Sequence, residues 1–105
     1  MRTKVWRFSV QLNSASKSQF DVLIPKVPAG SRPLCVMRDT GGEISVWMEV
    51  DPLAPLGYLK LLSIGTGHGL VPSNADYLGS VVDGEDVWHV YVPHAQSQES
   101  LLGKV

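Results

Sequence analysis

Residues 77–92 read Tyr-Leu-Gly-Ser-Val-Val, then Asp-Gly-Glu, then Asp-Val-Trp-His-Val-Tyr-Val. Apolar and polar side chains alternate with period two on both sides of an Asp-Gly turn, which is the pattern of a β-hairpin. In the second arm Trp88 and Val90 share the face that is predicted to point inward, while His89 and Tyr91 share the opposite face. This stretch predicts an antiparallel hairpin in an all-β protein.

The same alternation recurs upstream, with turn residues at roughly eight- to twelve-residue intervals. Six or seven antiparallel strands are therefore predicted, at residues 4–12, 18–24, 34–38, 43–50, 58–64, 77–82 and 86–92. The first two are expected to pair as a hairpin, and prolines at 25, 28 and 33 are expected to interrupt pairing between the second and third. Residues 58–64 are apolar on both faces, which is typical of a central strand. The expected architecture is a sandwich or a small barrel.

The chain of 105 residues is long enough for one domain. We assign residues 1–93 to a single β domain. Residues 94–105 turn polar and are predicted to form a C-terminal tail or a short helix. At most one short helical turn, at 72–76, is expected within the domain.

Composition restricts the possible partners. Charged residues make up only 18% of the chain and the formal net charge is −1, so apolar surface should remain for a partner subunit or a ligand. The nine Lys and Arg residues are scattered, although folding could gather Arg7, Arg32 and Arg38, and nucleic acid is not an expected partner. No segment approaches the roughly eighteen apolar residues of a membrane span, and no signal-peptide pattern opens the chain. We expect a cytoplasmic protein.

Cysteine and histidine give little support for redox or metal chemistry. Cys35 is the only cysteine, which excludes an intramolecular disulfide, and its apolar surroundings predict a buried, unreactive thiol. A metal site would need His68, His89 and His94 to converge, and no two of them are spaced to chelate from one short element. No metal site is predicted.

The sequence Gly65-Thr66-Gly67-His68-Gly69 allows two interpretations. Alternating glycines expose backbone amides that can form an anion-binding nest, with His68 as a proton donor or ligand. Alternatively, the chain leaves a sheet here through a bend that only glycine can make, which is the interpretation we favour. The segment lacks the Lys-Ser/Thr pair of a phosphate-binding loop and the following helix of a dinucleotide site, so no cofactor is predicted.

Aromatic residues on the outward strand faces provide a second candidate site. His89, Tyr91 and Trp47 could form an aromatic, titratable patch for a ligand or a partner. The simpler interpretation is that they stabilise the sheet through cross-strand contacts. The candidate binding residues are His68, Trp47, His89, Tyr91 and Gly67.

Several segments together resemble a known family. They are the Gly-Thr-Gly-His run at 65–68, the Tyr-Leu-Gly-Ser-Val run at 77–81 and the Val-Trp-His-Val-Tyr run at 87–91, with a Trp strand at 46–52 that ends in Asp-Pro. The order resembles small proteins common in bacteriophage genomes and other mobile elements, and it is compatible with an integron cassette. The family has no assigned activity, so the resemblance implies a context and singles out His68, Trp88 and His89. Gly69 stands where the family usually has proline.

These observations define the functional hypotheses. The first is a small non-catalytic binding or interaction protein that acts as a homo-oligomer and recognises a small molecule or a protein. The alternative is a small-molecule-binding protein or small enzyme with a pocket around His68, His89 and Tyr91. The third hypothesis is that the protein binds single-stranded nucleic acid on an aromatic sheet face, and the slightly negative net charge argues against it.

Overall fold

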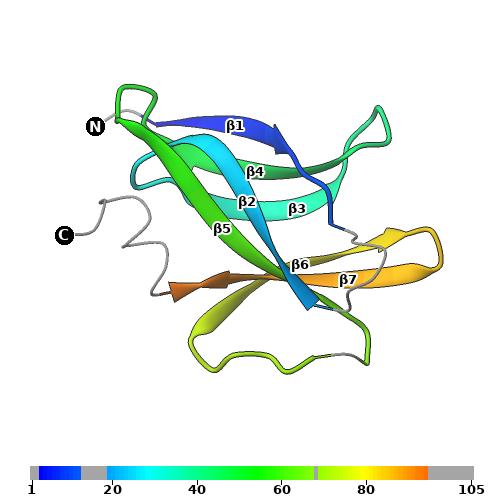
Figure 1. Cartoon of the computed structure of the whole chain (residues 1–105). Helices are drawn as coiled ribbons and strands as arrows, with labels where there is room; N and C mark the ends of the chain where they lie inside the picture. The colour runs from blue at the N-terminus through cyan, green and yellow to red at the C-terminus, as the bar shows by residue number, and fades with distance from the viewer. Residues whose placement is uncertain (1–2, 13–18, 68, 95–105) are drawn as a thin grey trace.

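The computed structural model describes residues 3–12, 19–67 and 69–94, and this part of the chain contains seven strands and no helix (Figure 1). The strands are β1 (Lys4–Ser9), β2 (Gln19–Pro28), β3 (Arg32–Arg38), β4 (Ile44–Val50), β5 (Leu56–Gly65), β6 (Ala75–Asp83) and β7 (Asp86–Pro93). They form one sheet in the order β1-β4-β3 and a second in the order β2-β5-β7-β6, with every pair antiparallel. The predicted all-β antiparallel fold is confirmed. It is a two-sheet sandwich, since the sheets do not close into a barrel.

The hairpin of residues 77–92 is present as β6 and β7, and Asp83 pairs with Asp86 across its end. The loop therefore has two residues, and the first of them, Gly84, has a positive φ of 66°. This conformation suits a type II′ turn, whose twist matches that of the flanking strands. The predicted central position of residues 58–64 is also confirmed, because β5 lies between β2 and β7.

The predicted hairpin between the first two strands is wrong. β1 pairs with β4, and β2 pairs with β5 in the other sheet. The chain leaves the three-stranded sheet after the Val10 amide donates to the Ile44 carbonyl, 3.0 Å away. Leu12 is then only 1% exposed, so the connecting segment enters the core between the sheets. Burial of this leucine explains why the alternation continued beyond the strand.

The prolines interrupt pairing less than predicted. β2 continues through Pro25 to Pro28 because the register shifts between Ile24 and Val27, and Lys26 takes up the irregularity with a φ of 59°. Both β2 and β3, which contains Pro33, are edge strands, where a missing backbone donor is tolerated. Residues 72–76 do not form a helical turn, since β6 begins at Ala75 and no helix occurs in the described part of the chain.

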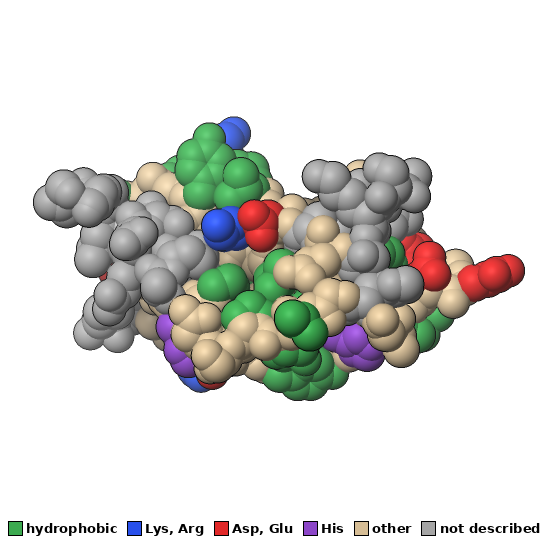
Figure 2. Space-filling model, turned by 60° about the horizontal axis from the view of Figure 1, so that its bottom comes forward, with side chains coloured by type: hydrophobic (Ala, Val, Ile, Leu, Met, Phe, Trp, Pro, Cys, Tyr) green, Lys and Arg blue, Asp and Glu red, His purple; other side chains and the backbone are tan. Residues whose placement is uncertain are grey.

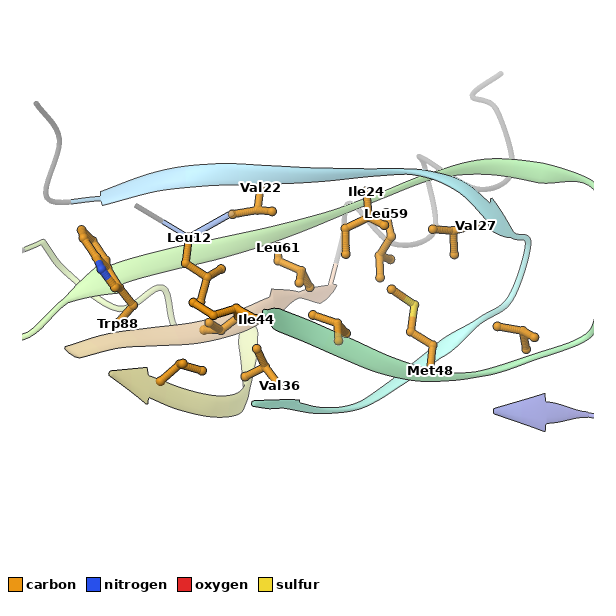
Figure 3. Packing of buried hydrophobic residues seen from close by; sticks show 14 residues of the cluster. Leu12, Val22, Ile24, Val27, Val36, Ile44, Met48, Leu59, Leu61 and Trp88 are labelled. Carbon is orange, nitrogen blue, oxygen red and sulfur yellow. The ribbon is translucent and has the colours of Figure 1, made fainter. Parts of the chain in front are cut away.

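The core fills the space between the two sheets (Figure 3). Met48 of β4 and Leu59 and Leu61 of β5 are completely buried. Trp88 is 5% exposed and Val90 is 0% exposed, which confirms that this face of β7 points inward.

Among the described residues no helix is long and apolar enough to cross a membrane. Most of the predicted tail, residues 95–105, lies outside the described residues.

Candidate functional site

His89 and Tyr91 lie on the outer face of the four-stranded sheet, opposite the buried Trp88 and Val90. This orientation confirms the alternation predicted for the last strand. The pairing register places His89 between Ile64 of β5 and Ser80 of β6. Figure 2, which brings the lower side of Figure 1 forward, shows hydrophobic side chains and histidines on the surface of this side.

A chain of four side chains runs through the His89 imidazole. Its Nε2 is 2.7 Å from Thr66 Oγ1, and its Nδ1 is 2.7 Å from Ser80 Oγ. The Tyr77 hydroxyl is 2.6 Å from the same Ser80 oxygen. These distances are typical of short, well-formed hydrogen bonds. Both ring nitrogens of His89 are therefore engaged by hydroxyl groups.

The direction of the chain follows from the carbonyl at one end. Thr66 Oγ1 lies 3.3 Å from the Val87 carbonyl, which can only accept a hydrogen bond. If Thr66 donates there, a neutral His89 donates to Thr66 from Nε2–H and accepts at Nδ1 from Ser80, which in turn accepts from Tyr77. Hydrogen-bond geometry thus assigns the Nε2–H tautomer to the neutral ring.

A pocket of about 370 Å³ opens beside this ring. It is lined by Ile64, Gly65, Thr66, Gly67, Gly69, Val71, His89 and Tyr91. Apart from the imidazole, the described residues of the lining contribute only apolar, hydroxyl and glycine groups. The Tyr91 ring is held edge-to-face against Tyr77, with centroids 5.5 Å apart and an interplanar angle of 62°. The pocket therefore has a fixed aromatic wall and a fixed imidazole.

The glycine-rich loop supplies another side of the pocket. Gly67 and Gly69 have φ angles of 81° and 68°, which side chains with a Cβ rarely adopt. A Cβ at Gly69 would also lie 3.3 Å from Cγ2 of Ile64 and would collide with the Gln19 side chain. The loop therefore makes the bend that the glycines predicted. His68 lies outside the described residues.

Trp47 does not join His89 and Tyr91. It belongs to β4 of the other sheet, where its neighbours Val46 and Met48 point into the core. Trp47 therefore faces outward on the opposite side of the sandwich, and a single patch of the three residues does not form. Period-two alternation shows that a side chain points outward without showing which sheet carries it.

Three residues of the site were not found by sequence reasoning: Thr66, Ser80 and Tyr77. The hairpin contained a usable signal for Ser80, because a two-residue loop between Asp83 and Asp86 places Ser80 opposite His89. Thr66 had no such signal, since its contact with His89 joins residues 23 positions apart.

Charge on the described surface is largely paired. Arg7 contacts Asp39 at 2.8 Å, Arg32 contacts Glu49 at 3.0 Å and Arg38 contacts Asp83 at 3.1 Å. The three arginines thus do not form an unneutralised basic surface. The described residues contain no group of three or more His, Cys, Asp or Glu side chains suited to a metal ion. Cys35 is partly exposed, so the predicted burial of its thiol is incomplete.

Together, fold and site define a two-sheet β-sandwich with a small, weakly polar pocket on one outer face. The family described as a domain of unknown function (DUF7352) matches residues 1–100, and the chain belongs to this family. No curated protein and no solved structure matches the chain.

Proposed function

We propose that this protein is a non-catalytic binding protein that holds a small uncharged molecule in the pocket beside His89 and Tyr91. The observation that carries the proposal is the pocket itself. Gly67, His89 and Tyr91 all line it, and the His89 imidazole is hydrogen-bonded at both nitrogens. A preformed apolar cavity with a few oriented polar groups is the usual form of a small-molecule site.

The lining indicates the chemistry of the ligand. Ile64, Val71 and the Tyr91 ring offer apolar contact, and Thr66 offers a hydroxyl group. Among the described residues no Asp, Glu, Lys or Arg lines the pocket, so none of them compensates a charged ligand for lost hydration. A volume of about 370 Å³ lies at the lower end of the range for ligand sites. The ligand is accordingly a small molecule with an apolar body and one hydrogen-bonding group.

The enzyme alternative rests on Ser80, whose hydroxyl lies 2.7 Å from His89 Nδ1 as in a nucleophile–base pair. Two features favour a positioning role for this contact. Ser80 is not among the residues that line the pocket, and its oxygen already accepts from Tyr77 in the neutral-ring arrangement. A molecule in the pocket would meet the imidazole and Thr66 rather than the serine.

Chemical-shift mapping by NMR tests the binding proposal. The probes are small uncharged compounds, beginning with benzyl alcohol and cyclohexanol, with His94→Gln as the matched control. His94 is also an exposed histidine, in contact with Asp76 at 2.8 Å, but it does not line the pocket. We expect saturable shifts at His89 and Tyr91 that His89→Ala abolishes and His94→Gln preserves. Equal binding by His89→Ala, or no saturable shift with any uncharged probe, would refute the proposal.

A homo-oligomer is the second proposal, and it is supported by apolar side chains on the same sheet. Leu23, Tyr58 and Tyr77 are 61%, 57% and 60% exposed. A second copy related by a two-fold axis would cover this surface with the same residues. Light scattering should give a dimer mass that Leu23→Lys reduces to the monomer, while Leu53→Lys, in a loop, leaves it unchanged. A monomer mass for the unmodified protein would contradict this proposal.

The resemblance to mobile-element proteins supports a proposal about context. We propose that the gene is carried by a phage genome or an integron cassette and that its product acts in the cytoplasm. Neighbouring integrase or phage genes, together with cell fractionation, provide the test. A chromosomal housekeeping setting or a secreted product would contradict it.

A further inference from the structure

A second pocket lies on the outer face of the three-stranded sheet, on the opposite side of the sandwich from His89. Its volume is about 580 Å³, and it contains Trp47, the predicted site residue that the first pocket does not use. It is lined by Arg7, Met37, Arg38, Asp39, Thr40, Gly41, Glu43 and Trp47. Unlike the first pocket, this one is rich in charged groups.

Arg7 is held firmly at one end of its guanidinium group. Its Nη1 donates to Asp39 Oδ2 at 2.8 Å and to Ser45 Oγ at 3.1 Å. Ser45 is completely buried, and its hydroxyl donates to the same Asp39 oxygen at 3.1 Å. The three side chains close a hydrogen-bonded ring, which fixes the orientation of the planar guanidinium.

Asp39 is itself held by the backbone. Its Oδ1 accepts from the amides of Gly41 at 2.8 Å and Glu43 at 3.0 Å. The Glu43 amide is the main cause that lowers the pKa of Asp39 below its ordinary value of 3.8, with help from Ser45, Gly41 and Arg7. The carboxylate therefore stays ionised at neutral pH and keeps Arg7 in place.

The other edge of the Arg7 guanidinium group is available for a ligand. Within the described residues its hydrogen bonds and its contact with Glu43 all involve Nη1, so the donors on Nε and Nη2 have no partner there. The side chain is 46% exposed. A guanidinium edge of this kind matches the two oxygens of a carboxylate. Trp47 is the cross-strand neighbour of Arg7, and Met37 is 50% exposed, so apolar walls lie beside the edge.

We propose that this second pocket binds a small monocarboxylate with an apolar body, its carboxylate on the Nε–Nη2 edge of Arg7 and its body against Trp47 and Met37. Among the described residues the charged groups in the lining are two arginines and two acids, which balance each other. A single negative charge on the ligand is tolerated there. A phosphate dianion would be repelled by Asp39 and Glu43, which lie next to Arg7.

The test uses phenylacetate as the probe and the Trp47 indole N–H signal in NMR as the readout, with that signal assigned from Trp47→Phe. We expect saturable shifts at Trp47 in the millimolar range. Phenylacetamide, which lacks the charge, and phenyl phosphate should each bind at least about tenfold more weakly. Equal binding of phenylacetamide, stronger binding of phenyl phosphate, or no shift with phenylacetate would overturn the proposal.

Variants of Arg7 separate the guanidinium from general charge. Arg7→Lys keeps the charge but loses the fork, and it should weaken phenylacetate binding about tenfold. Arg7→Met should abolish it. Arg32→Met is the matched control, because Arg32 lies on the same sheet face and, among the described residues, bonds to Glu49, outside the pocket. Unchanged affinity in Arg7→Lys would overturn the proposal even if Arg7→Met fails to fold. Shifts at Trp47 are read separately from those at His89, so this test is independent of the first pocket.

Discussion

His89 owes its fixed position to hydroxyl groups rather than to a carboxylate. Thr66 and Ser80 can each rotate a proton toward the ring or away from it, so both nitrogens stay bonded whether the imidazole is neutral or protonated. In the protonated state Ser80 accepts from Nδ1 and donates to Tyr77. The two hydroxyl groups hold the ring in one orientation. This property suits a binding wall.

Tyr77 should act on His89 only through Ser80, and a double-mutant cycle measures this dependence. Ser80→Ala should lower the free energy of unfolding by about 0.5–1 kcal/mol, since it removes partners from both His89 and Tyr77. Tyr77→Phe should then have almost no further effect. Urea denaturation of both single variants and the double variant provides the values. Additive losses would show that the chain does not behave as one unit.

Trp88 should be a major contributor to stability. Trp88→Ala is expected to lower the free energy of unfolding by about 3–5 kcal/mol, because the side chain is 5% exposed within the core. Trp47→Ala is the control, since Trp47 is partly exposed on an outer face and its truncation should be less damaging. Denaturant midpoints of the two variants are compared. Similar losses in both would contradict the assignment of Trp88 to the core.

At the scale of elements, β6 crosses close to β3 at Gly79. A Cβ on Gly79 would lie 2.9 Å from Cγ1 of Val36 and 3.4 Å from its carbonyl oxygen. Gly79→Ala should therefore destabilise the protein by about 1–3 kcal/mol through overpacking. Thermal unfolding of Gly79→Ala, Val36→Ala and the double variant measures the effect.

Val36→Ala supplies the control for this prediction. It removes the methyl group that a new Cβ would meet, so Gly79→Ala should be less harmful in that background. The same loss with and without Val36 would place the cause in the backbone of the β6 bulge, where the register shifts between Tyr77 and Gly79.

Elements formed by neighbouring residues were predictable from the sequence, and long-range pairings were not. The β6–β7 hairpin follows from alternation around a two-residue loop, so the outward position of His89 and Tyr91 could be deduced. Pairing of β1 with β4 joins Arg7 to Trp47, and nothing local marks these strands as partners. Proline does lack a backbone donor for strand pairing, as expected. The bulge at Lys26 and the edge positions of β2 and β3, where the missing donors are tolerated, were not predicted.

The two pockets also differ in how far they could be predicted from the sequence. Gly67, His89 and Tyr91 were recognisable because a glycine-rich bend and a strand with outward polar groups leave local patterns. The second pocket depends on Arg7 of β1 and Asp39 of the β3–β4 turn, which are 32 positions apart in the sequence. Each looks like an ordinary surface residue in the sequence. Their contact forms only after β1, β3 and β4 have assembled.

For the molecule as a whole, two broad outer faces enclose one core. Its extents are 41, 34 and 19 Å, so the faces are large relative to the thickness. One face carries the pocket beside His89 together with the exposed Leu23, Tyr58 and Tyr77, and the other carries the Arg7–Asp39 pocket with the exposed Met37. The two faces therefore offer chemically different surfaces, and occupation of one leaves the other open to solvent or to a partner.

Acid stability of the whole fold should depend on Asp39. Its pKa is lowered in the folded protein, chiefly by the Glu43 amide, so between the folded pKa and the ordinary value of 3.8 the unfolded chain binds more protons. The contribution of Asp39 is thus complete above pH 3.8 and is lost as the pH falls through the folded pKa. Asp39→Asn should lower the melting temperature at neutral pH, and its difference from the unmodified protein should shrink in acid. Asp86→Asn, at the exposed end of the β6–β7 hairpin, is the control and should show a much smaller difference. Parallel curves for Asp39→Asn and the unmodified protein throughout the acid range would show that the carboxylate is not what holds Arg7 and the β3–β4 turn together.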